Sequence, residues 1–528
     1  MIKRGVCSVL VLVLTLAFIL PAGALDYKFN MSYIYFGNSS DYAKLVSRTQ
    51  NSLNEVAPAY FTLDTQGKLV LTPAVSTDFV TKMHEKGILV VPYLTNDWVR
   101  DTGIAALKNK DALAADLAAA VLKYKLDGVN IDIENVTDAQ RSDYVAFARL
   151  LRDKLPAGKR IIAAVPANPY GSTTGWAGSY DYAGLAKYCD YLMLMAYDES
   201  YYGSKPGPVA SMSFVERSIK YALGQVPKEK IVLGLPFYGR IWSIGGGSVN
   251  GNGVSNEMVE TLIVKYGGTV TFDKVSQTAC ATITVKASDT KPVIYGLTLS
   301  AGTYVIWYAN EQALKAELAL VTKYDLKGTG SWSLGQETAQ TWDYYKLWLN
   351  GCTFSDVQSI WARDAILTAH VNGWMEGVSS TVFSPYASLT RAQAAAILVR
   401  LIGLTPAKSS FTFADCGGHW AQGYIDTARK YGIVSGTGGN CFKPDRPVTR
   451  AEMAVMLNNI LGYSSTAQTF TDVSKTEYSW AYGAISALET QGILNGYANG
   501  SFRPQNSITR AETAAIITRI DLSQRAVH

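Results

Sequence analysis

The chain of 528 residues is too long for a single hydrophobic core, so its length predicts at least two domains. Hydrophobic residues make up 48% of it and charged residues 17%, which excludes a mainly disordered chain. The net charge of +5 is small for this length and the sequence has no dense run of Lys and Arg, so we expect no nucleic-acid partner.

The first 24 residues have the pattern of a signal peptide. Lys3 and Arg4 precede an apolar run over 6–20, and Ala22-Gly23-Ala24 supplies the small residues typical of a cleavage site. The run is short for a membrane span, and no later stretch is long and apolar enough to be one. We therefore expect an exported protein that has no membrane association once residues 1–24 are removed.

Cysteine and histidine usage argues against a metal centre. Five cysteines follow the signal peptide, an odd number for an exported protein. Cys416 and Cys441 lie within one small unit and are the candidate disulfide pair, whereas Cys189, Cys280 and Cys352 are interpreted as buried or free thiols. Because there is no Cys-x-x-Cys motif and only four histidines, the sequence predicts neither a metal site nor a cofactor.

From residue 31 onward, short apolar segments alternate with helical patterns of 3.6-residue period. The expected strands are 31–37, 59–63, 87–95, 128–134, 160–167, 191–198, 230–239 and 328–335. Such alternation predicts an α/β fold, a parallel (β/α)8 barrel over residues 25–350, with its site at the carboxyl ends of the strands. The long interval before the last strand breaks this rhythm. Its part from 241 to 304 is rich in Gly, Thr and Val and predicts a small α+β insertion that walls one side of the cleft.

Residues 127–134 read Asp-Gly-Val-Asn-Ile-Asp-Ile-Glu, in which apolar and polar residues alternate from Val129 to Glu134. In a strand, Asn130, Asp132 and Glu134 project from one face. Three buried polar groups are costly, and two crowded carboxyls raise the pKa of one of them. A carboxyl that keeps its proton near neutral pH can act as a general acid. The segment therefore predicts acid catalysis at the end of the fourth strand.

The C-terminal third is a threefold repeat, expected over 353–407, 411–464 and 468–522. Thr-Arg-Ala recurs with its arginines at 391, 450 and 510, about 60 residues apart, which indicates one supersecondary unit stacked on its copies. In each copy the threonine is a candidate helix N-cap, and a Glu or Gln three residues later can complete a capping box. We expect a mainly helical module.

The first part resembles family 18 of the glycoside hydrolases. The resemblance is carried by residues 127–134, by Met195-Ala196-Tyr197-Asp198, by the segment 234–239 and by Trp332. It implies substrate-assisted, retaining hydrolysis of polymers of β-linked N-acetylglucosamine, in which the substrate acetamide replaces an enzyme nucleophile.

The resemblance also implies a role for each site residue. Glu134 would protonate the glycosidic oxygen, Asp132 would orient the acetamide, and Tyr197 would donate to the acetamide oxygen. The substrate-binding candidates are Asp127 and Asn130 as supports of Asp132, Asp198 against the sugar, Trp332 as an apolar floor, and Trp98 and Tyr238 near the strand ends. The alternative for each is a side chain that only braces the barrel.

The repeats resemble S-layer homology domains, which hold exported proteins on Gram-positive-type walls by binding secondary cell-wall polysaccharide. The resemblance places Arg391, Arg450 and Arg510 at acidic groups of this ligand, with Trp361, Trp420 and Trp480 and with Asp356, Asp415 and Asp472 nearby. The alternative is that each arginine only ties its unit together. The first repeat departs from the pattern because Gln393 replaces the usual Glu.

Three functions remain open at this point. The favoured one is a wall-anchored hydrolase of peptidoglycan, because residues 196–209 resemble the spore-cortex-lytic branch of family 18 and the anchor would place the enzyme beside this substrate. The second is a chitinase that acts on external chitin, against which no chitin-binding module is recognised. The third is a catalytically silent carbohydrate-binding surface protein, against which stands the presence of Glu134.

Overall fold

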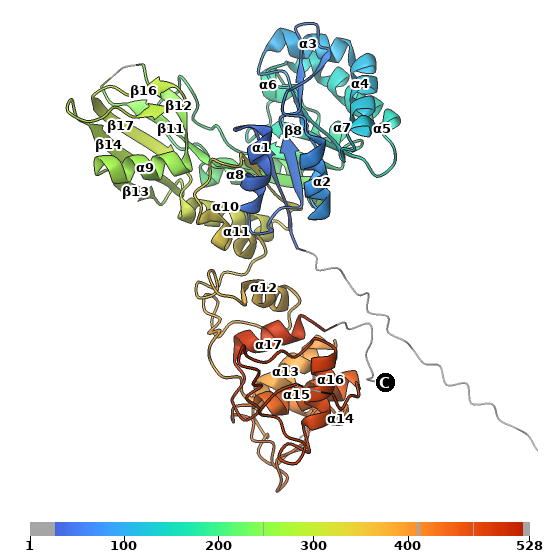
Figure 1. Ribbon diagram of the computed structural model, residues 1–528. Coiled ribbons are helices and arrows are strands. Elements are labelled where there is room, and N and C mark those ends of the chain that lie inside the picture. Colours follow the sequence, from blue (N-terminus) through green and yellow to red (C-terminus); the bar gives the residue numbers. More distant parts are fainter. Residues whose placement is uncertain (1–26, 246–247, 409–411, 468, 521–528) are drawn as a thin grey trace, which may run out of the picture. The chain divides into compact units, whose positions relative to one another are not determined.

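The computed structural model describes residues 27–245, 248–408, 412–467 and 469–520, and the predicted signal peptide lies outside them. The described residues form two compact units, one over 27–359 and one from 360 onward (Figure 1). In this part of the chain no helix has the length and apolar character needed to cross a bilayer.

The first unit is built on one curled sheet whose strands run parallel, except for β4 (Leu69–Leu71) at its edge. The strand order is β4-β3-β6-β7-β8-β9-β10-β18-β1-β2-β5. Its members are β1 (Phe29–Ile34), β2 (Glu55–Pro58), β3 (Phe61–Leu63), β5 (Leu89–Val90), β6 (Tyr93–Thr95), β7 (Gly128–Asp132), β8 (Arg160–Pro166), β9 (Tyr191–Met195), β10 (Ile231–Pro236) and β18 (Gly328–Trp332). The sheet closes into a barrel because β2 pairs with β5 and β3 pairs with β6. β2 and β3 are consecutive segments of one barrel strand, and β5 and β6 are consecutive segments of the next. The predicted barrel is therefore confirmed.

Helices cover the outside of this barrel (Figure 1). They are α1 (Ser39–Ser47), α2 (Thr77–Glu85), α3 (Arg100–Lys108), α4 (Lys110–Lys123), α5 (Arg141–Lys154), α6 (Gly175–Gly178), α7 (Tyr182–Ala186), α8 (Met212–Leu223), α10 (Glu311–Lys323) and α11 (Thr341–Leu349). On α4, Leu113, Leu117 and Val121 recur every fourth residue and are buried in the same core as Ile131 of β7. Burial of each such side chain contributes about 2 kcal/mol.

A second sheet follows β10 and precedes β18 in the chain. It is antiparallel, in the order β12-β11-β17-β14-β13, and has its own core against α9 (Asn256–Tyr266). Its strands are β11 (Tyr238–Ser243), β12 (Asn250–Ser255), β13 (Thr269–Asp273), β14 (Thr278–Val285) and β17 (Gly302–Tyr308), and a small hairpin adds β15 (Val293–Ile294) and β16 (Leu297–Thr298). The sheet thus runs from 238 to 308, beyond both expected ends; its start is early because a single residue separates β11 from β10.

The second unit is mainly helical, as expected. It contains α12 (Arg363–Val371), α13 (Arg391–Leu401), α14 (Gln422–Lys430), α15 (Arg450–Leu461), α16 (Tyr482–Thr490) and α17 (Arg510–Ile517). The second helix of each repeat packs on the first helix of the next, so that α13 meets α14, α15 meets α16, and α17 returns to α12. Each second helix begins at a threonine N-cap with a complete capping box, formed by Gln393 as well as by Glu452 and Glu512. The repeats therefore close into a ring.

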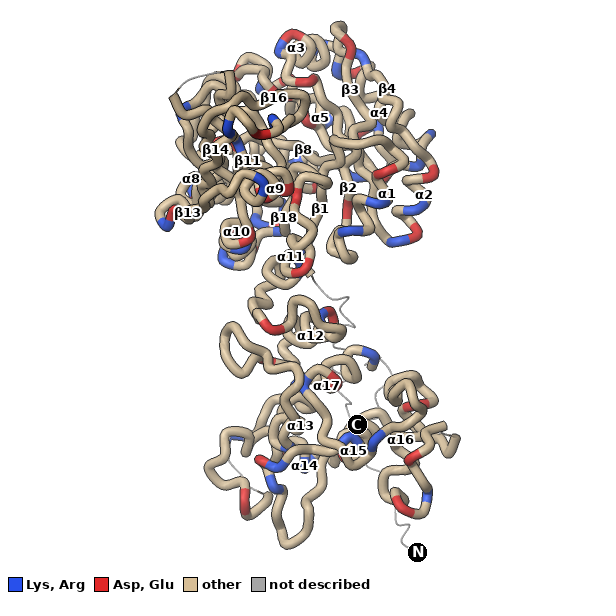
Figure 2. The backbone as a smooth tube through the Cα atoms, turned by 60° about the vertical axis from the view of Figure 1, so that its left-hand side comes forward, with Lys and Arg blue, Asp and Glu red and all other residues tan. Residues whose placement is uncertain are grey.

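Two smaller expectations concern thiols and charge. Cys416 and Cys441 are separate thiols, so the candidate disulfide is not formed in this structure. Basic and acidic residues are interspersed along the tube of both units (Figure 2).

Candidate active site

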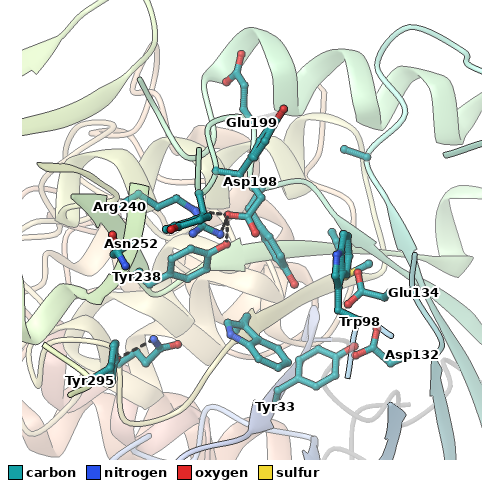
Figure 3. A pocket seen from close by; sticks show the side chains of 18 of the residues that line it. Tyr33, Trp98, Asp132, Glu134, Asp198, Glu199, Tyr238, Arg240, Asn252 and Tyr295 are labelled. Carbon is teal, nitrogen blue, oxygen red and sulfur yellow. Dashed lines mark hydrogen bonds and ion pairs between the residues drawn. The ribbon is translucent and has the colours of Figure 1, made fainter. Parts of the chain in front are cut away.

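The carboxyl ends of the barrel strands surround a cleft of about 1010 Å³. Most of the predicted site residues line it, namely Asp132, Glu134, Tyr197, Asp198, Trp332, Trp98 and Tyr238. The antiparallel sheet and its hairpin add Arg240, Asn252 and Tyr295 to the wall (Figure 3). The fold therefore brings together residues that lie far apart in the sequence.

The tip of β7 presents the two central carboxyls. Asp132 is the last residue of the strand and is 5% exposed, and no described residue hydrogen bonds its Oδ1. Between the carboxyls, Ile133 points the other way: its N–H donates to the Tyr144 hydroxyl (3.3 Å) and its C=O accepts from the Tyr180 hydroxyl (2.8 Å). The hydrogen bonds with Tyr144 and Tyr180 thus fix the backbone of Ile133 between the two carboxyl residues.

Burial and mutual repulsion change the acidity of both carboxyls. Burial raises the pKa of Asp132. Burial, followed by the charges of Asp132 and Asp198, raises the pKa of Glu134 well above its usual range. The raised pKa favours the protonated form of Glu134, which is the form that a general acid needs.

Tyr33 forms part of the cleft floor and was not predicted. Its hydroxyl accepts from Asn130 Nδ2 (3.0 Å), and its ring lies 5.3 Å from that of Trp332, centroid to centroid. Asn130 is fully buried and is not among the lining residues, so it supports the floor through Tyr33. Which face of β1 carries Tyr33 depends on how β1 pairs with β18, and the sequence does not give this register.

A second group of polar residues faces the carboxyls from β11 (Figure 3). Asp198 Oδ1 accepts from the Tyr238 hydroxyl (2.7 Å) and from Arg240 Nε (2.8 Å) and Nη2 (2.6 Å). Arg240 Nη1 also donates to the carbonyl of Gly251 (3.0 Å). The sequence does not reveal the role of Arg240, because this residue lies just beyond the motif at 234–239 and reaches Asp198 only through the fold of the inserted sheet.

Aromatic rings flank the cleft on the side of Glu134. Trp98 is half-exposed, and its ring meets that of Trp176 edge-on, with centroids 5.0 Å apart. Trp332 lies against Tyr33 and Tyr35. Such rings offer flat apolar faces with a polar edge, which suits the faces of sugar rings.

Asp127 requires a correction. It precedes β7, whereas Asp132 ends it, and its Oδ2 is hydrogen bonded to His84 Nε2 (2.7 Å) and to the N–H of Val90 (2.9 Å). The prediction that Asp127 supports Asp132 or the substrate is therefore wrong. Residue 127 is odd-numbered, so it does not share the strand face of residues 130, 132 and 134. It also lies at the amino end of the strand, away from the cleft.

The predicted arginines of the repeats are buried at the junctions between repeats. Arg391 donates to the carbonyls of Phe442 and Ser435 (both 2.8 Å) and pairs with Glu452 (3.1 Å). Arg450 makes the same kind of contacts with the third repeat, to Phe502, Asn495 and Glu512. Arg510 donates to the carbonyls of Phe383 and Glu376 in the first repeat. Each arginine thus ties one repeat to the next, which was the alternative interpretation.

The predicted tryptophans are exposed: Trp361 by 64%, Trp420 by 60% and Trp480 by 54%. Trp480 lines a cavity of about 410 Å³ together with Arg391 and Arg446. Asp415 and Asp472 accept from backbone N–H groups of the Phe-x-Pro turns, so they shape the loops. Ligand binding by the arginines and tryptophans stays a prediction.

Among the described residues, no three His, Cys, Asp or Glu side chains gather as metal ligands would. Family comparisons agree with the fold. A sequence model described as "Glycosyl hydrolases family 18" matches residues 31–337, more than half of the chain. The chain belongs to this glycosyl hydrolase family. Three matches to the S-layer homology domain follow the family 18 domain, at 353–395, 412–454 and 469–514.

Individual relatives match different shares of the chain. The family 18 domain is similar to the crystal structure of a chitinase from Chromobacterium violaceum ATCC 12472, with 25% identity, a TM-score of 0.53, and coverage of 61% of this chain and 99% of that one. The "Putative sporulation-specific glycosylase YdhD" of Bacillus subtilis (strain 168) is 31% identical over 210 residues, which are 39% of this chain and 46% of that protein. The chain thus spans less than half of the length of YdhD. A "Cellulosome-anchoring protein" of Acetivibrio thermocellus is 34% identical over 155 residues, 28% of this chain and 35% of that protein.

Proposed function

We propose that the chain is a cell-surface glycosidase that hydrolyses β-1,4 linkages in polymers containing N-acetylglucosamine, with peptidoglycan as the favoured substrate. The observation that carries this proposal is the pair of carboxyls at the tip of β7. Both carboxyls line a cleft that is large enough for a glycan, and burial and the charge of Asp132 raise the pKa of Glu134, which favours its protonated form. Membership of family 18 supports the same chemistry.

The mechanism that we propose is the substrate-assisted one that the family 18 resemblance implies for these side chains. Glu134 donates its proton to the glycosidic oxygen while the acetamide oxygen of the bound sugar attacks the anomeric carbon, so the bond to the leaving sugar breaks. Asp132 accepts from the acetamide N–H and the Tyr197 hydroxyl donates to the acetamide oxygen, which orients the internal nucleophile. Glu134, now a carboxylate, takes a proton from water as the water opens the oxazolinium ring, and the configuration is retained.

Replacing the acid tests the assignment. In the full chain, Glu134→Gln should lower the release of reducing ends by about 100- to 10,000-fold. Binding of chitooligosaccharide should survive, because the amide has the shape of the carboxyl. Glu199 is the matched control, since it lines the same cleft but its Oε2 accepts from the N–H of Ser211 (2.8 Å). Glu199→Gln should cost less than about tenfold; equal losses in the two variants would refute the role of Glu134.

One observation favours the chitinase alternative. Among the described residues that line the cleft, Arg240 is the only Lys or Arg, and it is bonded to Asp198 and to Gly251. No cation in this lining is therefore left to meet the carboxylate of a muramyl substituent, whereas chitin is uncharged. Mass spectrometry of the products from peptidoglycan and from chitin, digested side by side, decides between the two. Muropeptide products would support the favoured substrate, and chitooligosaccharides alone would support the alternative.

We propose that the repeats attach the enzyme to secondary cell-wall polysaccharide. The exposed tryptophans and the cavity beside Arg391 and Trp480 support this role. A fragment from residue 353 onward should sediment with purified Gram-positive-type walls and should stop doing so once the wall polysaccharide is extracted. Unchanged sedimentation would contradict polysaccharide capture.

A further inference from the structure

The side chain of Asn96 grips the backbone of the acid residue. Asn96 follows β6 and is 2% exposed. Its Oδ1 accepts from the N–H of Glu134 (2.8 Å), and its Nδ2 donates to the carbonyl of Glu134 (2.9 Å) and to that of Val99 (2.9 Å). A single carboxamide thus satisfies both backbone groups of Glu134.

These hydrogen bonds take the place of strand pairing beyond the end of the sheet. The pairing of β6 with β7 stops at Thr95 and Asp132, so Glu134 lies beyond the last paired residue. Without a partner, its backbone would be free to change direction, and its partly buried N–H and C=O would lack their hydrogen bonds to the protein. The Asn96 side chain supplies the two hydrogen bonds that another pair of strand residues would have made.

A second set of hydrogen bonds joins the loop after β6 to Asn135, the residue that follows the acid. Asn135 Nδ2 donates to the carbonyl of Trp98 (2.9 Å), while Arg100 donates to the Asn135 carbonyl (2.8 Å) and to its Oδ1 (2.9 Å). Asp97, Trp98 and Asn135 have positive φ angles of 49°, 63° and 59°. Such conformations cost about 1 kcal/mol or more each, and they persist where surrounding bonds determine them. The ring of Trp98 and the backbone of Glu134 therefore share one rigid frame.

We propose that Asn96 is a positioning residue, which fixes where the Glu134 carboxyl enters the cleft relative to the Trp98 ring. The inference rests on the proposed role of Glu134 as general acid. The chemical step depends on this placement more than substrate binding does, because a displacement of about 1 Å can cost about 100-fold in rate.

A neighbouring asparagine gives a matched control. Asn168 follows β8, is also 2% exposed, accepts from the N–H of Ser172 (2.7 Å) and donates to its carbonyl (2.9 Å). It makes the same pair of bonds within its own loop. Loss of either carboxamide should cost similar stability, but only Asn96 bonds to the acid residue.

The experiment compares Asn96→Ala with Asn168→Ala in the full chain, with chitooligosaccharide as the probe. For Asn96→Ala we expect kcat to fall about 100-fold while KM changes less than about threefold. For Asn168→Ala we expect kcat within about threefold of the unchanged protein. Equal losses of kcat in the two variants would overturn the inference, as would a loss in Asn96→Ala that appears in KM alone.

Asn96→Asp adds a readout that a merely structural role would not move. The carboxylate keeps the bond from the Glu134 N–H but adds a negative charge, which raises the pKa of Glu134 and moves the alkaline limb of the kcat profile to higher pH. The titratable groups that already face Glu134 are Asp132, Asp198, Tyr33, Tyr144, Tyr180 and Tyr197. They are the same in both proteins, so the shift reports position 96. An unchanged limb would overturn the inference even if Asn96→Ala fails to fold.

The two proposals can fail separately. If Glu134→Gln abolishes hydrolysis and Asn96→Ala behaves as Asn168→Ala does, the positioning role alone is wrong. If Glu134→Gln retains hydrolysis, the proposed function is wrong and the positioning role falls with it.

Discussion

The cleft and the junctions between the repeats both bury charged groups, but they treat them in opposite ways. In the cleft, Asp132 is buried with one oxygen that no described residue hydrogen bonds, and its pKa is raised by burial. At the junctions, Arg391 and Arg450 each meet two backbone carbonyls and one carboxylate. An unsatisfied buried group is costly, and a partnered one is costly only when its partner is removed.

This difference teaches which unit is organised for a ligand. A carboxyl oxygen without a protein partner, inside a cleft, remains available to a group on a bound molecule, and such sites are where perturbed pKa values gather. A guanidinium that is bonded across a junction has used its donors to assemble the protein. The first pattern indicates chemistry, and the second indicates architecture that holds any ligand-binding surface in shape.

Breaking a junction should produce the largest effect on stability. Arg450→Ala removes three bonds to the next repeat and leaves Glu512 without its cation, so we expect the free energy of unfolding of the repeat unit to fall by about 3–5 kcal/mol. Chemical denaturation of the full chain, followed through the transition of the repeats, measures it. Arg503 is the control, because it is exposed and stacks on Tyr497 of the same repeat. Arg503→Ala should cost less than about 1 kcal/mol, and a similar cost for both would show that the junction bonds contribute little.

The corresponding change in the cleft should have the opposite sign. Asp132→Asn should make the barrel more stable by about 1–3 kcal/mol at pH 8, because it removes a buried carboxylate, one oxygen of which no described residue hydrogen bonds. The raised pKa means that the folded state holds the Asp132 proton above the usual aspartate value of about 4, so the native protein loses stability as pH rises from there. The gain should therefore vanish below about pH 4.

The activity of the same variant should move the other way. Hydrolysis should fall by about 100-fold or more, since the amide no longer orients the acetamide as a carboxylate does. Denaturation curves at several pH values and rates on chitooligosaccharide check both signs. A variant that loses stability at pH 8 would show that the Asp132 carboxylate is well satisfied in the free protein, as the junction arginines are.

Sequence patterns predicted what depends on local periodicity, and missed what depends on register. The alternation at 128–134 places Asp132 and Glu134 in the cleft, and the capping boxes at Thr390, Thr449 and Thr509 form as expected. The roles of three residues cannot be predicted from the sequence, because each acts through a neighbour that only the closed barrel or the inserted sheet brings near. These residues are Tyr33, Arg240 and Asn96. The motif resemblance groups Asp127 with Asp132, but the phase of the alternation and its place before β7 separate it from the cleft.

The smallest effect should come from the other end of β7, where Asp127 lies. Asp127→Asn keeps an oxygen that can accept from the N–H of Val90 (2.9 Å in the native protein), but it loses the charge that faces His84 (2.7 Å) and Lys159 (3.6 Å). We expect about 1 kcal/mol or less of lost stability, because these ion pairs are partly exposed, and kcat/KM within about twofold, because the altered atoms lie a whole strand away from the cleft. Denaturant midpoints give the change in stability and rates on chitooligosaccharide give kcat/KM, both measured alongside Asp132→Asn. A loss of activity close to that of Asp132→Asn would mean that the amino end of the strand controls the tip, and would restore the support role that the structure denies to Asp127.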